Sequence, residues 1–411
     1  MTERRERIGR TVGLTDESVC PTLLPKDQSR GAGASACQPS LSQLPPIEVT
    51  ADLASLDAAI QALPNSPAVF ALWPHQGEPY LSKTALLRRR LLRLLKEREK
   101  PSRLLNLRHT VARIEYWLTG SAFESAVVLY EQARRHFPES YLDLLKLRMP
   151  PYLKIVLNNQ FPRSHITTHL TRSGGLYFGP FRSRASAEKF EAQFLDLFQL
   201  RRCQEDLLPS TAHPGCIYGE MGMCLRPCQL VVGAAEYAHE VARVVEFLRT
   251  DGRSLADAIA HSRDRLSDTM QFEEAARQHK RLEKVEDVLK LRDDLARDVD
   301  RLNGVAITRS RAPFAVEMWF MCEGNWQQPQ RFGFEVREGK TVSLDHRLRE
   351  TFARVTPRKL ALRERQEYLA LLARWYYSSW REGEWLSFDS YDDIPYRKLV
   401  NAISRVTRGE S

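Results

Sequence analysis

The sequence predicts an α+β protein built from several small units. Short strands joined by a hairpin turn occur between residues 68 and 118, four cysteines cluster between 203 and 228, and residues 233–302 have an almost continuous helical pattern. The expected units are a disordered tail (1–50), a small mixed sheet with helices (51–148), a cysteine-rich domain (149–232), a helical hairpin (233–302) and an α/β segment (303–411).

Charge and hydropathy limit the possible partners. The formal net charge of +9 favours a polyanion, nucleic acid before a membrane surface, although a basic protein without such a partner has the same charge. No apolar stretch approaches the ~20 residues of a membrane span. The N-terminus lacks the apolar core of a signal peptide, so we expect a cytoplasmic protein, where disulfides are rare.

The first region begins after a tail rich in Ser, Gly, Pro and Gln, which contains Cys20 and Cys37. An amphipathic helix is expected over 51–63, followed by a hairpin of strands at 68–72 and 79–81. The further elements expected are a helix from 85 to about 96 that Thr84 could cap, a strand at 111–118 and a helix at 123–135.

Two charged residues share the apolar faces of these helices. Arg90 lies three residues after Leu87, and Glu131 lies four residues after Val127, so both charges tilt toward one small core. A buried charge needs a partner or a function. The two alternatives are an Arg–Glu salt bridge and a catalytic pair.

The four clustered cysteines are the strongest signal in the sequence. Cys203, Cys216, Cys224 and Cys228 are separated by twelve, seven and three residues, with glycines and Pro227 between them. Four soft thiolates suit zinc or an iron–sulfur cluster, and the spacing does not choose between these metals. Scattered core thiols are the alternative.

The segments around the cysteines are basic and then helical. Arginines and lysines between 182 and 202 follow closely after Tyr177, Phe178 and Phe181, and this combination indicates either a phosphate-facing surface or a basic face over an aromatic core. Helices are expected at 236–249 and from 255 to about 300, broken at 250–252. Strands at 305–308, 315–322 and 331–336 and a helix at 357–381 are expected after them.

Several stretches resemble one family, UvrC, the excinuclease of bacterial nucleotide excision repair. PAVFALWPHQGEPYLSKTALLRRRL resembles its GIY-YIG nuclease opening, and PPYLKIVLNNQFPR and GGLYFGPFRSRASA resemble the segment that follows. The four cysteines match the place of its iron–sulfur cluster, and MQFEEAARQHKRLEKV resembles its UVR helical hairpin. The likeness covers roughly residues 51–300.

The resemblance assigns roles to individual residues. It implies four catalytic residues. Tyr80 activates the attacking water, and Lys83 is the lysine that follows this tyrosine in the motif. Arg90 steadies the scissile phosphate, and Glu131 holds one Mg²⁺ or Mn²⁺ ion. The resemblance also implies a [4Fe-4S] cluster on the four cysteines, with Zn²⁺ as the alternative. The implied partners are damaged double-stranded DNA and UvrB, the latter bound through Phe272, Glu273, Ala275 and Ala276.

The chain also departs from the family pattern. The differences are Ala68, Phe70, Ser82, Leu94, the missing asparagine after Glu131, and His279-Lys280 in the hairpin. A second nuclease domain of ribonuclease H type and helix-hairpin-helix repeats are not expected. Two hypotheses follow: a divergent metal-dependent endonuclease that makes one incision, and an adaptor that binds DNA or UvrB with weakened catalysis.

Overall fold

The computed structural model describes residues 46–48, 53–96, 107–172, 174–334 and 343–409. Cys20, Cys37 and nearly all of the expected tail lie outside these residues. The first region contains, in chain order, β1 (Ile47–Glu48), α1 (Leu53–Gln61), β2 (Ala68–Pro74), β3 (Tyr80–Thr84), α2 (Leu87–Leu94), β4 (Val111–Leu118), α3 (Ala122–His136) and α4 (Tyr141–Leu145). The expected hairpin, strand and helices are present.

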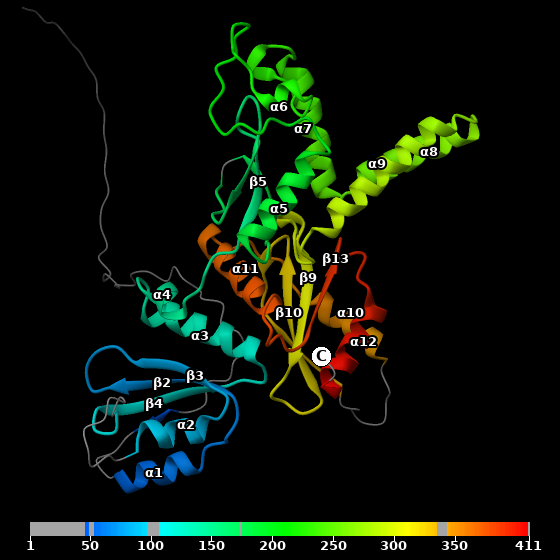
Figure 1. Cartoon of the computed structure of the whole chain (residues 1–411). Helices are drawn as coiled ribbons and strands as arrows, with labels where there is room; N and C mark the ends of the chain where they lie inside the picture. The colour runs from blue at the N-terminus through cyan, green and yellow to red at the C-terminus, as the bar shows by residue number, and fades with distance from the viewer. Residues whose placement is uncertain (1–45, 49–52, 97–106, 173, 335–342, 410–411) are drawn as a thin grey trace, which may run out of the picture. The chain divides into compact units, whose positions relative to one another are not determined.

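The first sheet has the order β1-β4-β2-β3, and each of these strand pairs is antiparallel. Because side chains alternate along a strand, β2 serves two cores. Phe70 and Leu72 pack with α1 and α2 on one face, whereas Val69 and Ala71 pack with α3 on the other face (Figure 1).

Helices α2 and α3 begin differently. At α3, the Ser121 side chain caps the helix by accepting a hydrogen bond from the backbone N–H of Glu124. At α2 the cap position is Leu86, which has no side-chain cap. Thr84 therefore does not cap α2 as expected, because it ends strand β3, where its hydroxyl accepts from the N–H of Leu86 at 3.2 Å.

The middle region consists of a second antiparallel sheet, order β6-β5-β7-β8, with helices packed against it. Its elements are β5 (Tyr152–Val156), β6 (Ser164–Thr167), β7 (Gly175–Gly179), α5 (Arg184–Leu195), α6 (Ile217–Glu220), the 3-10 helix Pro227–Gln229, α7 (Ala234–Arg249) and β8 (Arg297–Asp298). Phe178 and Phe181 are buried in its core with Phe190 and Phe194. Of the two alternatives that the sequence left open for these rings, the structure therefore supports the aromatic core.

The helical hairpin is formed by α8 (Arg253–Asp268) and α9 (Phe272–Lys290), which lie side by side (Figure 1). The sequence predicted one continuous helix from 255 to about 300. Instead the chain turns at Thr269-Met270-Gln271, with Met270 at φ 60°, and α9 ends at Lys290. Met270 adopts the left-handed conformation without a Gly or Pro signal, which is why the turn was missed.

The last region has a third sheet, order β11-β10-β9-β13, with β12 also paired to β10. Its elements are a 3-10 helix (Val299–Arg301), β9 (Asn303–Arg309), β10 (Ala315–Cys322), β11 (Asn325–Trp326), β12 (Gln330–Gly333), α10 (Leu344–Ala353), α11 (Leu362–Tyr376), β13 (Glu384–Phe388) and α12 (Tyr396–Arg408). The sequence did not predict α10, β13 or α12. The α+β class is confirmed.

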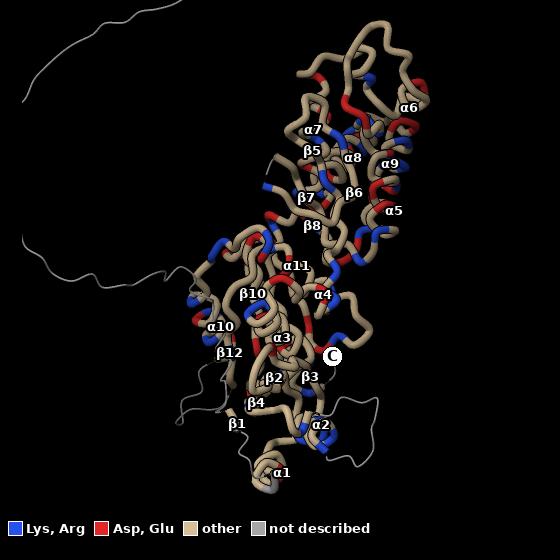
Figure 2. Tube along the Cα trace, turned by 90° about the vertical axis from the view of Figure 1, so that its left-hand side faces the viewer, with Lys and Arg blue, Asp and Glu red and all other residues tan. Residues whose placement is uncertain are grey.

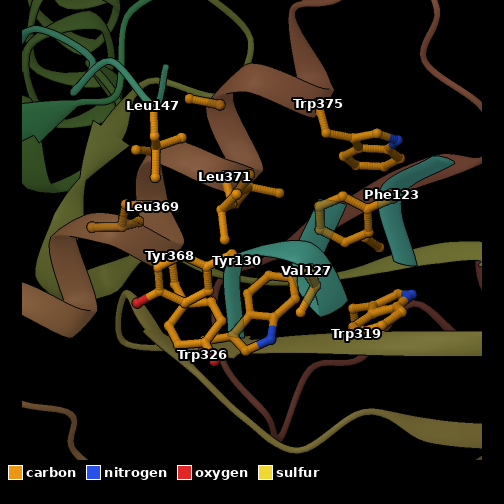
Figure 3. Packing of buried hydrophobic residues seen from close by; sticks show 14 of the residues in the cluster. Phe123, Val127, Tyr130, Leu147, Trp319, Trp326, Tyr368, Leu369, Leu371 and Trp375 are labelled. Atoms are coloured by element: carbon orange, nitrogen blue, oxygen red, sulfur yellow. The ribbon is translucent and has the colours of Figure 1, made fainter. Parts of the chain in front are cut away.

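One buried cluster joins α3 to this last region. Phe123 of α3 contacts the rings of Trp319, Trp326 and Trp375, with centroid separations of 5.3, 5.6 and 4.7 Å (Figure 3). Within the part of the chain that the structure describes, no helix is long and apolar enough to span a membrane.

Candidate functional site

Tyr80 and Arg90 lie together on the α2 face of the first sheet. Tyr80 packs against the core that contains Leu87 and Leu91, and Arg90 projects from α2 beside it. The Arg90 Nη2 donates to the Tyr80 hydroxyl at 3.4 Å. Arg89 and Arg93 are exposed on the same helix, where Figure 2 shows a cluster of basic positions. This face can present a phenol and guanidinium groups to an anion.

Lys83 lies on the opposite face of the same strand. It is three residues after Tyr80, so alternation places it with Leu81 on the α3 side. Its side chain is exposed, and its Nζ lies 5.6 Å from the ring centre of Trp380. Partial desolvation and the nearby charge of Arg374 lower the pKa of the Lys83 amine.

Glu131 also lies on the α3 side, facing the last region. Its carboxylate accepts a hydrogen bond from the Tyr368 hydroxyl of α11 at 3.2 Å. Burial raises the pKa of Glu131 to about 8, against the lowering effect of Tyr368, Arg358 and Arg134, and Glu364 raises it further. To hold a hard cation such as Mg²⁺, Glu131 would have to lose its proton and separate from the Tyr368 hydroxyl.

The sequence interpretation of Arg90 and Glu131 therefore needs correction in one respect. The two charges do not tilt toward one core, because α2 and α3 cover opposite faces of the sheet. Among the described residues they form no ion pair with each other. The structure brings Tyr80 to Arg90 and places Lys83 and Glu131 on the other side.

A buried acid explains why α3 is held against α11. Glu367 is 1% exposed, and its carboxylate accepts hydrogen bonds of 2.6 Å from both the Tyr130 and Tyr141 hydroxyls and one of 3.0 Å from Arg363. These charge-assisted bonds fix α11 over the face of α3 that contains Glu131. Sequence analysis missed Glu367 and Tyr368. The aromatic density after residue 367 was the available signal.

The four clustered cysteines come into one neighbourhood. Cys224 and Cys228 are buried, Cys203 is partly buried and Cys216 is exposed. Burial, and then repulsion from the other cysteines, raises the pKa of both Cys224 and Cys228, although a backbone N–H at Arg226 opposes this at Cys224. Within the described residues, no three Cys, His, Asp or Glu side chains form a ready ligand set for a metal ion.

The backbone around these cysteines is tightly constrained. Arg226 and Leu230 adopt φ 55° and 56° on either side of the short helix that contains Cys228. The Arg226 N–H points at the Cys224 Sγ, 3.4 Å away, and the Arg201 Nη1 lies 3.4 Å from the Cys203 Sγ. Left-handed conformations at bulky residues are uncommon and cluster at functional sites.

The tip of the helical hairpin exposes apolar side chains. Phe272 is 64% exposed and Met270 is 78% exposed. Of the other expected partner-binding residues, Glu273 and Ala276 are exposed and Ala275 is buried. Exposed aromatic and Met side chains at a tip are suited to a protein partner.

Comparison with known proteins agrees with one family. Residues 150–247 match the family model described as UvrC/Cho excinuclease, middle domain. The UvrABC system protein C of Moorella thermoacetica is 26% identical over 78% of this chain and 53% of its own length. The protein of the same name from Lachnospira eligens is 25% identical over 70% of this chain and 48% of its own length.

A third relative extends further along this chain. The UvrABC system protein C of Acetivibrio thermocellus is 22% identical over 84% of this chain and 56% of its own length. The chain thus spans about half the length of the curated relatives it matches. No solved structure matches it. The matched middle domain contains all four clustered cysteines together with β5, β6, β7, α5 and most of α7, and the chain is similar to UvrC proteins.

Proposed function

We propose that this chain acts in nucleotide excision repair as an adaptor that binds DNA and a UvrB-like partner. Its first region, which resembles a GIY-YIG nuclease, would serve mainly for recognition. The observation that carries this proposal is the hydrogen bond of Glu131 to Tyr368, on the sheet face opposite Tyr80 and Arg90. An incision site would need these groups around one phosphate.

The basic helix α2 supports DNA binding in this proposal. Arg89, Arg93 and Lys96 are exposed, and Arg90 lies beside them. Arginine and lysine contacts to phosphates would supply affinity without reading sequence, and this affinity would fall with salt. Binding to a damaged duplex is therefore expected to weaken steeply as ionic strength rises.

A metal-dependent endonuclease is the second candidate function. The Tyr80–Arg90 contact favours it, because a phenol next to a guanidinium is the pair that the family resemblance assigns to water activation and phosphate binding. Glu131 would have to release Tyr368 before it could hold a Mg²⁺ or Mn²⁺ ion.

A nicking assay separates these two functions. We expect the wild-type chain to bind damaged duplex DNA without cleaving it, with Mg²⁺ or Mn²⁺ and with or without UvrA and UvrB. Glu131→Ala should bind DNA as the wild type does. Nicking by the wild type that is lost in both Tyr80→Phe and Glu131→Ala would establish the endonuclease instead, and an exposed control, Glu139→Ala, should then keep it.

The cysteine group is proposed to bind a thiolate-ligated metal, an iron–sulfur cluster before zinc. Its soft donors, the Arg226 N–H directed at the Cys224 Sγ and the Arg201 guanidinium beside the Cys203 Sγ fit such a group. Cys203, Cys216, Cys224 and Cys228 would be the ligands. Bound there, the cluster would link the chain segments around the four cysteines into one rigid unit.

The hairpin tip gives a further test of the proposed adaptor. Replacement of Phe272 by Ala is expected to weaken binding to UvrB at least tenfold, about 1.4 kcal/mol, because an exposed ring at an interface centre is a typical hot spot. Phe314, which is 66% exposed at a distant turn, provides the matched control. Equal affinities of Phe272→Ala and Phe314→Ala, measured by calorimetry, would exclude the tip as the docking site.

A further inference from the structure

Arg201 is a buried cation beside the cysteine group. The residue is 1% exposed. Its Nε donates to the Phe161 carbonyl at 2.8 Å, and its Nη1 donates to the carbonyls of Glu205 and Cys203 at 2.8 and 3.2 Å. The same Nη1 lies 3.4 Å from the Cys203 Sγ. The guanidinium is therefore fixed in position against one of the four thiols.

The charge of Arg201 is not balanced by a carboxylate. Among the described residues, none forms an ion pair with it, and its Nη2 is buried without a hydrogen-bond partner. A buried charge is costly unless it is paired. The three carbonyl groups supply only partial charge, so the arrangement lacks an anion. The ionisable group that Arg201 contacts is the Cys203 thiol.

A second contact ties Arg201 to the same neighbourhood. Its backbone N–H donates to the Tyr237 hydroxyl at 3.0 Å, and that hydroxyl donates to the Pro162 carbonyl at 2.8 Å. Tyr237 is fully buried on α7. Arg201 is thus held on both its backbone and its side chain, as expected of a group whose position matters.

We propose that Arg201 is the buried counter-cation of the four-cysteine group and stabilises its thiolates when a metal or iron–sulfur cluster is bound. This role rests on the proposed function of the cysteines. Thiolate ligation places several negative charges in a partly buried site, and a fixed guanidinium offsets them. A nearby positive charge also favours the reduced cluster, because reduction adds an electron.

The next residue, Arg202, provides a matched control. Its Nη2 pairs with Asp196 at 2.7 Å, and its guanidinium lies 5.3 Å from the ring centre of Tyr218. It is adjacent to Cys203 in sequence and has the same charge as Arg201, but that charge is already balanced by Asp196. Loss of Arg202 should therefore change the metal site little.

The test compares wild type, Arg201→Met, Arg201→Lys and Arg202→Met as full-length chains. Each is reconstituted without oxygen, once with iron and sulfide and once with zinc. We expect Arg201→Met to release its metal to a chelator at least tenfold faster than wild type. Its iron–sulfur form should be harder to reduce by a tenfold change in equilibrium, which is 59 mV for one electron. Arg201→Lys and Arg202→Met should stay near wild type.

Three results would overturn the proposal. Equal release rates and potentials for Arg201→Met and Arg202→Met would make Arg201 a structural residue only. Equal losses in Arg201→Lys and Arg201→Met would assign the effect to the carbonyl bonds and not to charge. Failure of all four proteins, wild type included, to hold metal would remove the proposed cluster and with it this role. If Arg201→Met does not fold, Arg201→Gln takes its place, because it removes the charge and keeps a hydrogen-bond donor for the carbonyl groups.

Discussion

Truncation of Trp375 to Ala is expected to lower the free energy of unfolding by about 3–5 kcal/mol, as large-to-small substitutions in a core do. Trp375 is 1% exposed, its ring packs 4.7 Å from that of Phe123, and its Nε1 donates to the Glu382 carbonyl at 3.2 Å. The substitution leaves a cavity where α11 meets α3. Denaturant unfolding followed by fluorescence measures the loss.

Trp380 is the control for this experiment, because it lies five residues further along and is 42% exposed. Trp380→Ala should cost less than about 1 kcal/mol, since little apolar area leaves the interior. Hydrogen exchange of the α3 amides should accelerate in Trp375→Ala and not in Trp380→Ala. Similar costs for both substitutions would mean that the Phe123–Trp375 contact does not hold α3 to the last region.

Local sequence signals explain which parts of the fold could be predicted. The β2–β3 hairpin and α3 follow from local patterns, namely alternation and the Ser121 cap. The turn at Met270 was missed because nothing local favours its positive φ. Local signals were not always recognised, because α10 begins after the Ser343 cap and was still not predicted.

The candidate site was less predictable, because its partners are remote in sequence. Tyr368 lies 237 residues from Glu131, and helical spacing cannot reveal such a contact. Helical spacing placed Arg90 and Glu131 on the apolar faces of their helices. It does not indicate on which face of the sheet each helix packs. The cysteines were recognised because their signal is local. Their counter-cation was not, because Arg201 looked like one of many surface arginines.

The second large effect is expected in the dependence of stability on pH. Burial raises the pKa of Glu131 to about 8, and that of Glu124 to about 7, from an ordinary value near 4.5. At these two carboxyl groups, the folded chain then binds more protons than the unfolded chain between pH 4.5 and 8. The free energy of unfolding therefore falls as pH rises through this window and levels off above it.

The groups around the two carboxyls define what this titration disturbs. Glu131 faces Tyr368, Arg358, Glu364 and Arg134. Ionisation places a negative charge at the joint between α3 and α11. Each pKa unit corresponds to about 1.4 kcal/mol. After allowance for the partial exposure of Glu131, its ionisation should lower the free energy of unfolding by on the order of 2 kcal/mol between pH 5 and 8.5.

Glu124 adds to this loss on the same helix. It accepts a hydrogen bond from the Gly120 N–H at 2.6 Å, which favours its charged form. Glu317 opposes that form, while Arg331 and Arg311 support it. Its contribution to the pH dependence of stability should therefore be smaller than that of Glu131, and Glu124 should titrate at a lower pH than Glu131.

Glu131→Gln is the variant that isolates this effect, because it keeps the shape of the side chain and cannot ionise. We expect it to match the wild type near pH 5 and to exceed its stability at pH 8.5, so that the slope becomes shallower. Glu139→Gln, an exposed position on the same region, controls for the change in net charge. A Glu131→Gln slope equal to that of the wild type would mean that Glu131 is ionised in the folded chain. An ionised Glu131 would be a suitable ligand for Mg²⁺, and that result would favour the metal-dependent endonuclease over the adaptor.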